Sequence, residues 1–166
     1  NAGQPYAASD PHLLTWVHVA ETSRFLAAHL RYKNPQLTLA EQDRYYEEAA
    51  IIAEALGAEK VPKTVQAVED YLQAMRPELI CDERTLEVMQ LLINAPAPSW
   101  QAKPAMHVML KAGMGLLPDW AQQQIQQPIG PLTQWRVDKE IAVIAGLLRW
   151  SIQRGAYTRA MQRMGR

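Results

Sequence analysis

Residues 10–18 read Asp-Pro-His-Leu-Leu-Thr-Trp-Val-His and mark the start of a helix. Aspartate is a typical N-cap residue, and proline suits the first helical position because the backbone donor that proline lacks has no partner there. The apolar periodicity continues almost to Pro35, and a proline disfavours helical geometry in the residue before it. The sequence therefore predicts a helix over residues 11–32.

The rest of the chain carries helix signals and lacks strand signals. Thr38 and Glu41 form a capping box, Asp82 is a further N-cap, and no alternating run of β-branched residues lies between tight turns. The near-continuous apolar content of residues 132–153 predicts the central helix of the core, and Gly155 is expected to separate it from the last helix. A length of 166 residues suits one domain. We therefore expect an all-α fold, a single-domain orthogonal bundle of about seven to eight helices, over residues 11–32, 39–56, 65–75, 83–93, 103–116, a short segment after Pro118, 132–153 and 156–166.

Composition and charge argue against several classes of protein. The 17 Lys and Arg residues balance 17 Asp and Glu residues, so we expect no nucleic-acid partner. The single cysteine, Cys81, allows no internal disulfide and no multi-thiolate zinc site. The longest apolar stretch, residues 141–148, is far shorter than the roughly 20 residues of a membrane helix, so we expect no transmembrane segment. Because no export signal is visible, the default location is cytoplasmic, although the chain does not begin with Met and a signal could precede it.

His18 is the residue that most suggests chemistry. At helical spacing, its neighbours on one face are Leu14, Thr22 and Phe25. A buried neutral imidazole needs partners for its nitrogens, so the ring is either a core histidine bonded to a backbone carbonyl or a metal ligand. His29 lies about 16 Å further along the helix, too far to share one ion. A single imidazole suffices when a porphyrin supplies the other four ligands of an iron.

Other candidate residues leave their interpretation open. His107 is either a second ligand or a partly buried helix residue, and the charged run of residues 41–48 is typical of a solvated helix face. Arginines near the end of the chain are either solvated or pair with haem propionates, a partner's carboxylates or an anionic surface. These arginines are Arg149, Arg154, Arg159, Arg163 and Arg166.

A longer pattern extends through the chain in blocks: Tyr6-x-x-x-Asp10-Pro11-x-Leu13-Leu14-x-Trp16-Val17-His18, Pro35-x-Leu37-Thr38-x-Ala40-Glu41-x-Asp43-Arg44-Tyr45-Tyr46, Leu56-Gly57, Val61-Pro62, Tyr71, Met75-Arg76-Pro77 and Leu117-Pro118-x-Trp120. With the arginine-rich end, this pattern resembles the MpaB and latex-clearing (rubber oxygenase) family. The resemblance implies an all-helical fold, a b-type haem and cleavage of carbon–carbon double bonds with dioxygen. It also implies that His18 is the proximal iron ligand beside an apolar wall of Leu14, Thr22 and Phe25. Residues 1–166 would then be the C-terminal major part of one such domain.

The leading functional hypothesis is a haem b-dependent, oxygenase-like protein that acts with dioxygen on an apolar small molecule, isoprenoid or lipid-like. A second hypothesis is a haem-free helical binding protein with a hydrophobic pocket. A third is that these residues are one part of a larger assembly, in which a second copy or a further segment completes the core.

Overall fold

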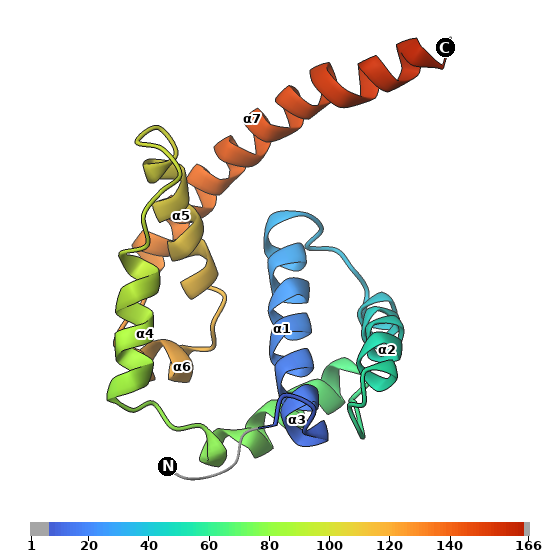
Figure 1. Ribbon diagram of the computed structural model, residues 1–166, viewed down its shortest axis with the longest axis vertical. Coiled ribbons are helices and arrows are strands. Elements are labelled where there is room, and N and C mark those ends of the chain that lie inside the picture. Colours follow the sequence, from blue (N-terminus) through green and yellow to red (C-terminus); the bar gives the residue numbers. More distant parts are fainter. Residues whose placement is uncertain (1–6, 165–166) are drawn as a thin grey trace. The chain divides into compact units, whose positions relative to one another are not determined.

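The computed structural model describes residues 7–164, except for the side chains of residues 151–160 and 162. Within this range the chain forms seven α-helices and one short 3₁₀ helix, and it forms no strand (Figure 1). The predicted all-α fold of seven to eight helices is confirmed. Contacts within the chain divide it into two units, Asn1–Ile80 and Cys81–Arg166. The arrangement of all helices as one bundle stays a prediction.

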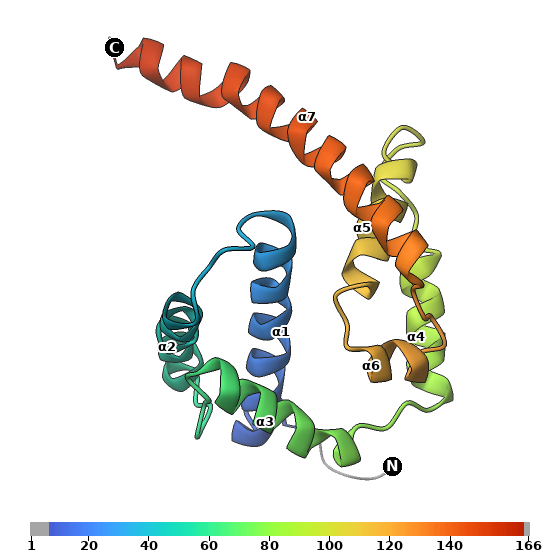
Figure 2. The same cartoon turned by 180° about the vertical axis from the view of Figure 1, so that it is seen from behind.

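The first unit contains three α-helices that contact one another. They are α1 (Pro11–Tyr32), α2 (Leu39–Ala55) and α3 (Val65–Met75), followed by the 3₁₀ helix η1 (Arg76–Glu78). Figure 1 and Figure 2 show α1 and α2 side by side, with α3 crossing them. The predicted caps are confirmed: the Asp10 carboxylate accepts from the His12 amide at 2.9 Å, and Thr38 and Glu41 form a capping box.

Two buried clusters hold the first unit together. One consists of Val19, Leu26, Tyr46 and Val68, contributed by all three helices. The other consists of small side chains of α2 and the loop after it, namely Ala50, Ala53, Ala58 and Val61, with Leu14 of α1 packed against them. These contacts fix the rotation of α1, because the side of α1 that carries Val19 and Leu26 faces α2 and α3.

The second unit contains α4 (Glu83–Ile93), α5 (Lys103–Met114), α6 (Asp119–Gln124) and α7 (Pro131–Arg163). In both views α5 packs along the N-terminal part of α7. The buried Gln122 amide ties the loops of this unit together, because it donates to the Leu117 carbonyl at 2.8 Å and accepts from the Ile129 amide at 2.9 Å. None of the described helices combines the length and apolar content that a bilayer-spanning helix needs.

Two expectations about the last helices are wrong. Gly155 does not end a helix, since α7 continues to Arg163; a glycine inside a helix costs only about 1 kcal/mol relative to alanine. Residues 132–153 are not a buried core helix either, because Val137 is the one buried residue among the described side chains of α7. Trp135, for example, is 60% exposed. The apolar residues of α7 surround the helix, whereas α5 covers only one side of it.

Candidate functional site

His18 lies in the middle of α1, at the edge of the face that packs against α2 and α3, and it is half-buried. Its main-chain carbonyl accepts a hydrogen bond from the Thr22 hydroxyl at 2.7 Å. The imidazole ring itself bonds to none of the described residues. The ring is therefore not the carbonyl-bonded core histidine that was one interpretation of the sequence, as far as the described part of the chain extends.

The environment of His18 favours the neutral ring. Partial burial lowers the pKa of His18 below its ordinary value, and the nearby carboxylate of Glu21 opposes this shift less strongly. At neutral pH the ring is uncharged, and one nitrogen then carries a free lone pair. A neutral imidazole is the form that binds a metal ion.

The three predicted neighbours of His18 lie within two turns of it but differ in burial. Leu14 is half-buried against the alanine-rich cluster, and Phe25 is 60% exposed. Thr22 is buried, and its hydroxyl is engaged with the His18 carbonyl. Val17, which the sequence reasoning did not select, is also exposed. The open surface beside His18 therefore carries the apolar side chains of Val17 and Phe25 together with the exposed carboxylate of Glu21.

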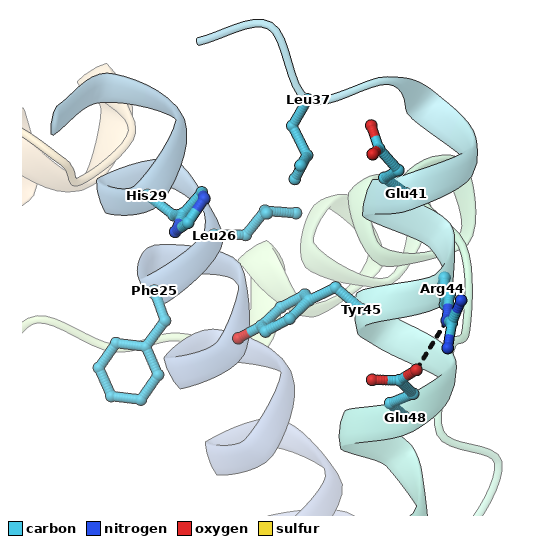
Figure 3. Close-up of a pocket in the computed structure, with 8 residues that line it drawn as sticks. All are labelled: Phe25, Leu26, His29, Leu37, Glu41, Arg44, Tyr45 and Glu48. Carbon is cyan, nitrogen blue, oxygen red and sulfur yellow. Dashed lines mark hydrogen bonds and ion pairs between the residues drawn. The ribbon is translucent and has the colours of Figure 1, made fainter. Parts of the chain in front are cut away.

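A pocket of about 470 Å³ lies between α1 and α2 and includes Phe25 (Figure 3). Its apolar lining comes from Phe25 and Leu26 on α1, Leu37 on the connecting loop and Tyr45 on α2. His29 lines it from the next turn of α1. The sequence reasoning missed this pocket. The spacing of Phe25 and His29, one helical turn apart on the side that carries His18, was the available signal.

The charged groups around the pocket have partners of their own. The Glu41 carboxylate accepts from the Thr38 amide at 2.8 Å and from its hydroxyl at 2.7 Å, and these bonds lower the pKa of Glu41. The Arg44 guanidinium bonds to Glu48 at 2.7 Å on the outer side of α2, as Figure 3 shows. These residues match the solvated face predicted for residues 41–48. They leave the pocket with an apolar lining and no unpaired carboxylate.

Tyr45 connects the pocket to α1. Its hydroxyl donates to the Thr22 carbonyl at 3.2 Å, and Figure 3 shows the phenol ring reaching from α2 toward α1. The ring lies edge-on to Tyr46, with ring centroids 5.4 Å apart. Burial raises the pKa of Tyr45, so its hydroxyl keeps its proton and remains a donor at neutral pH.

The comparison with known families bears on this region and on most of the chain. Residues 1–150 match the family described as "ER-bound oxygenase mpaB/B'/Rubber oxygenase, catalytic domain". The chain belongs to this family. No curated protein and no solved structure gives a significant match. The family predicted from the sequence is therefore confirmed. Membership of this family suggests an oxygenase-like function with a small-molecule substrate.

The described side chains of this oxygenase-family domain form no group of three His, Cys, Asp or Glu residues that could hold a metal ion. His107, the second candidate ligand, is exposed on α5 and lines a separate pocket of about 420 Å³ with Trp100 and Met106. Arg149 and Arg163 are exposed, whereas the side chains of Arg154, Arg159 and Arg166 lie outside the described residues.

Proposed function

We propose that this domain is a haem b-dependent oxygenase that acts with dioxygen on an apolar small molecule, isoprenoid or lipid-like, and that His18 is its iron ligand. The observation that carries the proposal is the His18 ring: half-buried, neutral and without a hydrogen-bond partner among the described residues. Membership of an oxygenase family supports it further. A single nitrogen donor beside the apolar side chains of Val17 and Phe25 fits a porphyrin iron, which needs one further ligand from the protein.

His18, Val17, Phe25 and Thr22 would each contribute differently to holding a haem. When bound, haem b would supply the redox chemistry for cleaving a carbon–carbon double bond with dioxygen. The His18 ring donates the lone pair of one nitrogen, while Val17 and Phe25 offer apolar surface that excludes water. Thr22 acts through the backbone, because its hydroxyl is already bonded to the His18 carbonyl.

The pocket between α1 and α2 supports an apolar substrate. Its volume of about 470 Å³ lies within the roughly 300–1,000 Å³ usual for small-molecule sites. At its rim Arg44 is paired with Glu48, and Thr38 occupies the Glu41 carboxylate with hydrogen bonds, so the largely apolar lining favours an uncharged hydrocarbon. Phe25 belongs both to the pocket and to the open surface beside His18.

The test compares two histidine substitutions in protein purified with haem supplied. We expect a Soret band in the wild-type protein and in His107→Ala, and loss or displacement of that band in His18→Ala. His107→Ala is the matched control because it removes an exposed imidazole from the second unit. A wild-type protein without a Soret band, or a band that His18→Ala leaves unchanged, would contradict the proposal.

A second candidate function is a haem-free binding protein that keeps the family fold. The pocket supports this alternative, because its lining is largely apolar. This function predicts binding of a neutral fluorescent hydrocarbon probe, weakened by Phe25→Ala, in a protein that carries no iron. Elemental analysis separates the two functions, since stoichiometric iron in the purified protein would reject the haem-free alternative.

A further inference from the structure

Two hydrogen bonds in series join α2 to the turn of α1 that carries His18. The Tyr45 hydroxyl donates to the Thr22 carbonyl at 3.2 Å, and the Thr22 hydroxyl donates to the His18 carbonyl at 2.7 Å. Both carbonyls lie inside α1, so each bond acts on the helix backbone. A threonine hydroxyl that bonds to the carbonyl four residues earlier can bend a helix locally. The backbone at His18 therefore depends on the side chains of two other residues.

Tyr45 is well placed to hold this turn. Its ring packs edge-on against Tyr46, which belongs to the buried cluster of the first unit. On its other side the ring forms a wall of the pocket together with Leu26 and Leu37 (Figure 3). The position of the Tyr45 ring is thus set by α2 and the core, and its hydroxyl links the ring to the backbone of α1 at the Thr22 carbonyl.

We propose that Tyr45 is a positioning residue, which acts through Thr22 to set the direction of the His18 imidazole. This inference rests on the proposed role of His18 as an iron ligand. Side chains occupy discrete rotamers relative to their backbone, so a rotation of the helical turn redirects the ring it carries. The orientation of a ligating histidine affects the affinity and reactivity of the metal that it binds. The groups that fix this orientation act without touching the metal.

The first experiment uses the protein without haem. We expect the NMR signals of the His18 ring, assigned by their loss in His18→Ala, to shift in Tyr45→Phe. Tyr71→Phe is the matched control, because the Tyr71 hydroxyl is also buried but has no hydrogen-bond partner within the described residues. It should leave the His18 signals in place.

A second pair of variants removes the other bond in the series. Thr22→Val deletes the hydroxyl that reaches the His18 carbonyl and should also shift the His18 signals, whereas Thr22→Ser keeps a hydroxyl and should restore them. If Tyr45→Phe does not fold, this pair still tests the bond from Thr22 to His18, through which Tyr45 is proposed to act. His18 signals that are the same in folded Tyr45→Phe or folded Thr22→Val as in the wild-type protein would overturn the proposal.

The haem-loaded protein offers a spectroscopic measurement that would not change if Tyr45 only stabilised the fold. In the ferrous state, the iron–histidine stretching band should shift in Tyr45→Phe and stay unchanged in Tyr71→Phe. If His18→Ala retains the full haem spectrum, the proposed function fails, and the haem-free NMR comparison still judges the link from Tyr45 to His18. If His18→Ala loses haem and Tyr45→Phe leaves both the band and the ring signals unchanged, the positioning role alone is rejected.

Discussion

The two units use similar amphipathic helices to different effect. In the first unit, α1, α2 and α3 bury a shared cluster that includes Val19 and Leu26. In the second unit, α4 also has an apolar face, but its residues Leu86, Met89 and Ile93 are only half-buried, and no residue of α4 is fully buried. The comparison teaches that periodicity defines which face of a helix is apolar, while burial requires a second element at the right place.

The largest expected difference concerns the leucines of the two units. Leu26→Ala empties part of the buried cluster and should lower the free energy of unfolding by about 2–5 kcal/mol. Leu147→Ala, on the exposed side of α7, should change it by no more than about 0.5 kcal/mol. Amide hydrogen exchange measured separately in each unit checks both values, because the chain need not unfold in one step. Equal losses of unfolding free energy in the two variants would contradict the difference in burial between the two units.

A smaller effect is expected from one buried polar residue in each unit, Thr15 in the first and Gln122 in the second. The Thr15 hydroxyl accepts from the Glu59 amide at 3.2 Å, and Gln122 bridges two loops of the second unit. Thr15→Val and Gln122→Leu should each cost about 1–3 kcal/mol, because each leaves buried backbone groups unpaired. Hydrogen exchange in the affected loops measures this cost. Thr15→Ser keeps the hydroxyl, and Gln123→Leu changes an exposed neighbour, so near-wild-type exchange is expected for both controls.

The smallest effect is the response of two helix ends to acid. Hydrogen bonds from Thr38 lower the pKa of Glu41 in the first unit, and bonds from Thr85 lower the pKa of Asp82 in the second. A lowered folded-state pKa stabilises the fold above the pKa of the unfolded state, and this contribution disappears as the pH falls through the folded-state pKa. Backbone NMR shifts at the start of α2 and at the start of α4 should therefore each change on acidification, at a pH below the ordinary pKa of the capping carboxylate. In Glu41→Gln the response should vanish at α2 and persist at α4; persistence at both would contradict the assignment.

The sequence predicted most helix boundaries because the signals for them are local. Asp10, Thr38 and Asp82 cap helices as expected, since a capping side chain reaches only two or three residues along the chain. Gly155 misled because a glycine signals a helix end without enforcing one. The face of α1 that carries His18 followed from helical spacing alone, and the family followed from the motif around His18.

The pocket could not have been predicted in the same way. Phe25 and Tyr45 are 20 residues apart in sequence and belong to different helices. Their proximity depends on how α1 and α2 pack, and that packing is set by contacts among all three helices of the unit. The bond from Tyr45 to Thr22 has the same origin, and no spacing rule points to it.

The amino-acid sequence by itself determined most of the helices, their caps and the family, because each of these depends on residues close together in the chain or on a recognisable motif. Only the tertiary structure decided that the described side chains of α7 are largely exposed, that the Tyr45 hydroxyl reaches the Thr22 carbonyl, and that Tyr45 closes a pocket against α1. These features depend on which side chains from distant segments meet, and the burial that drives such meetings is non-directional.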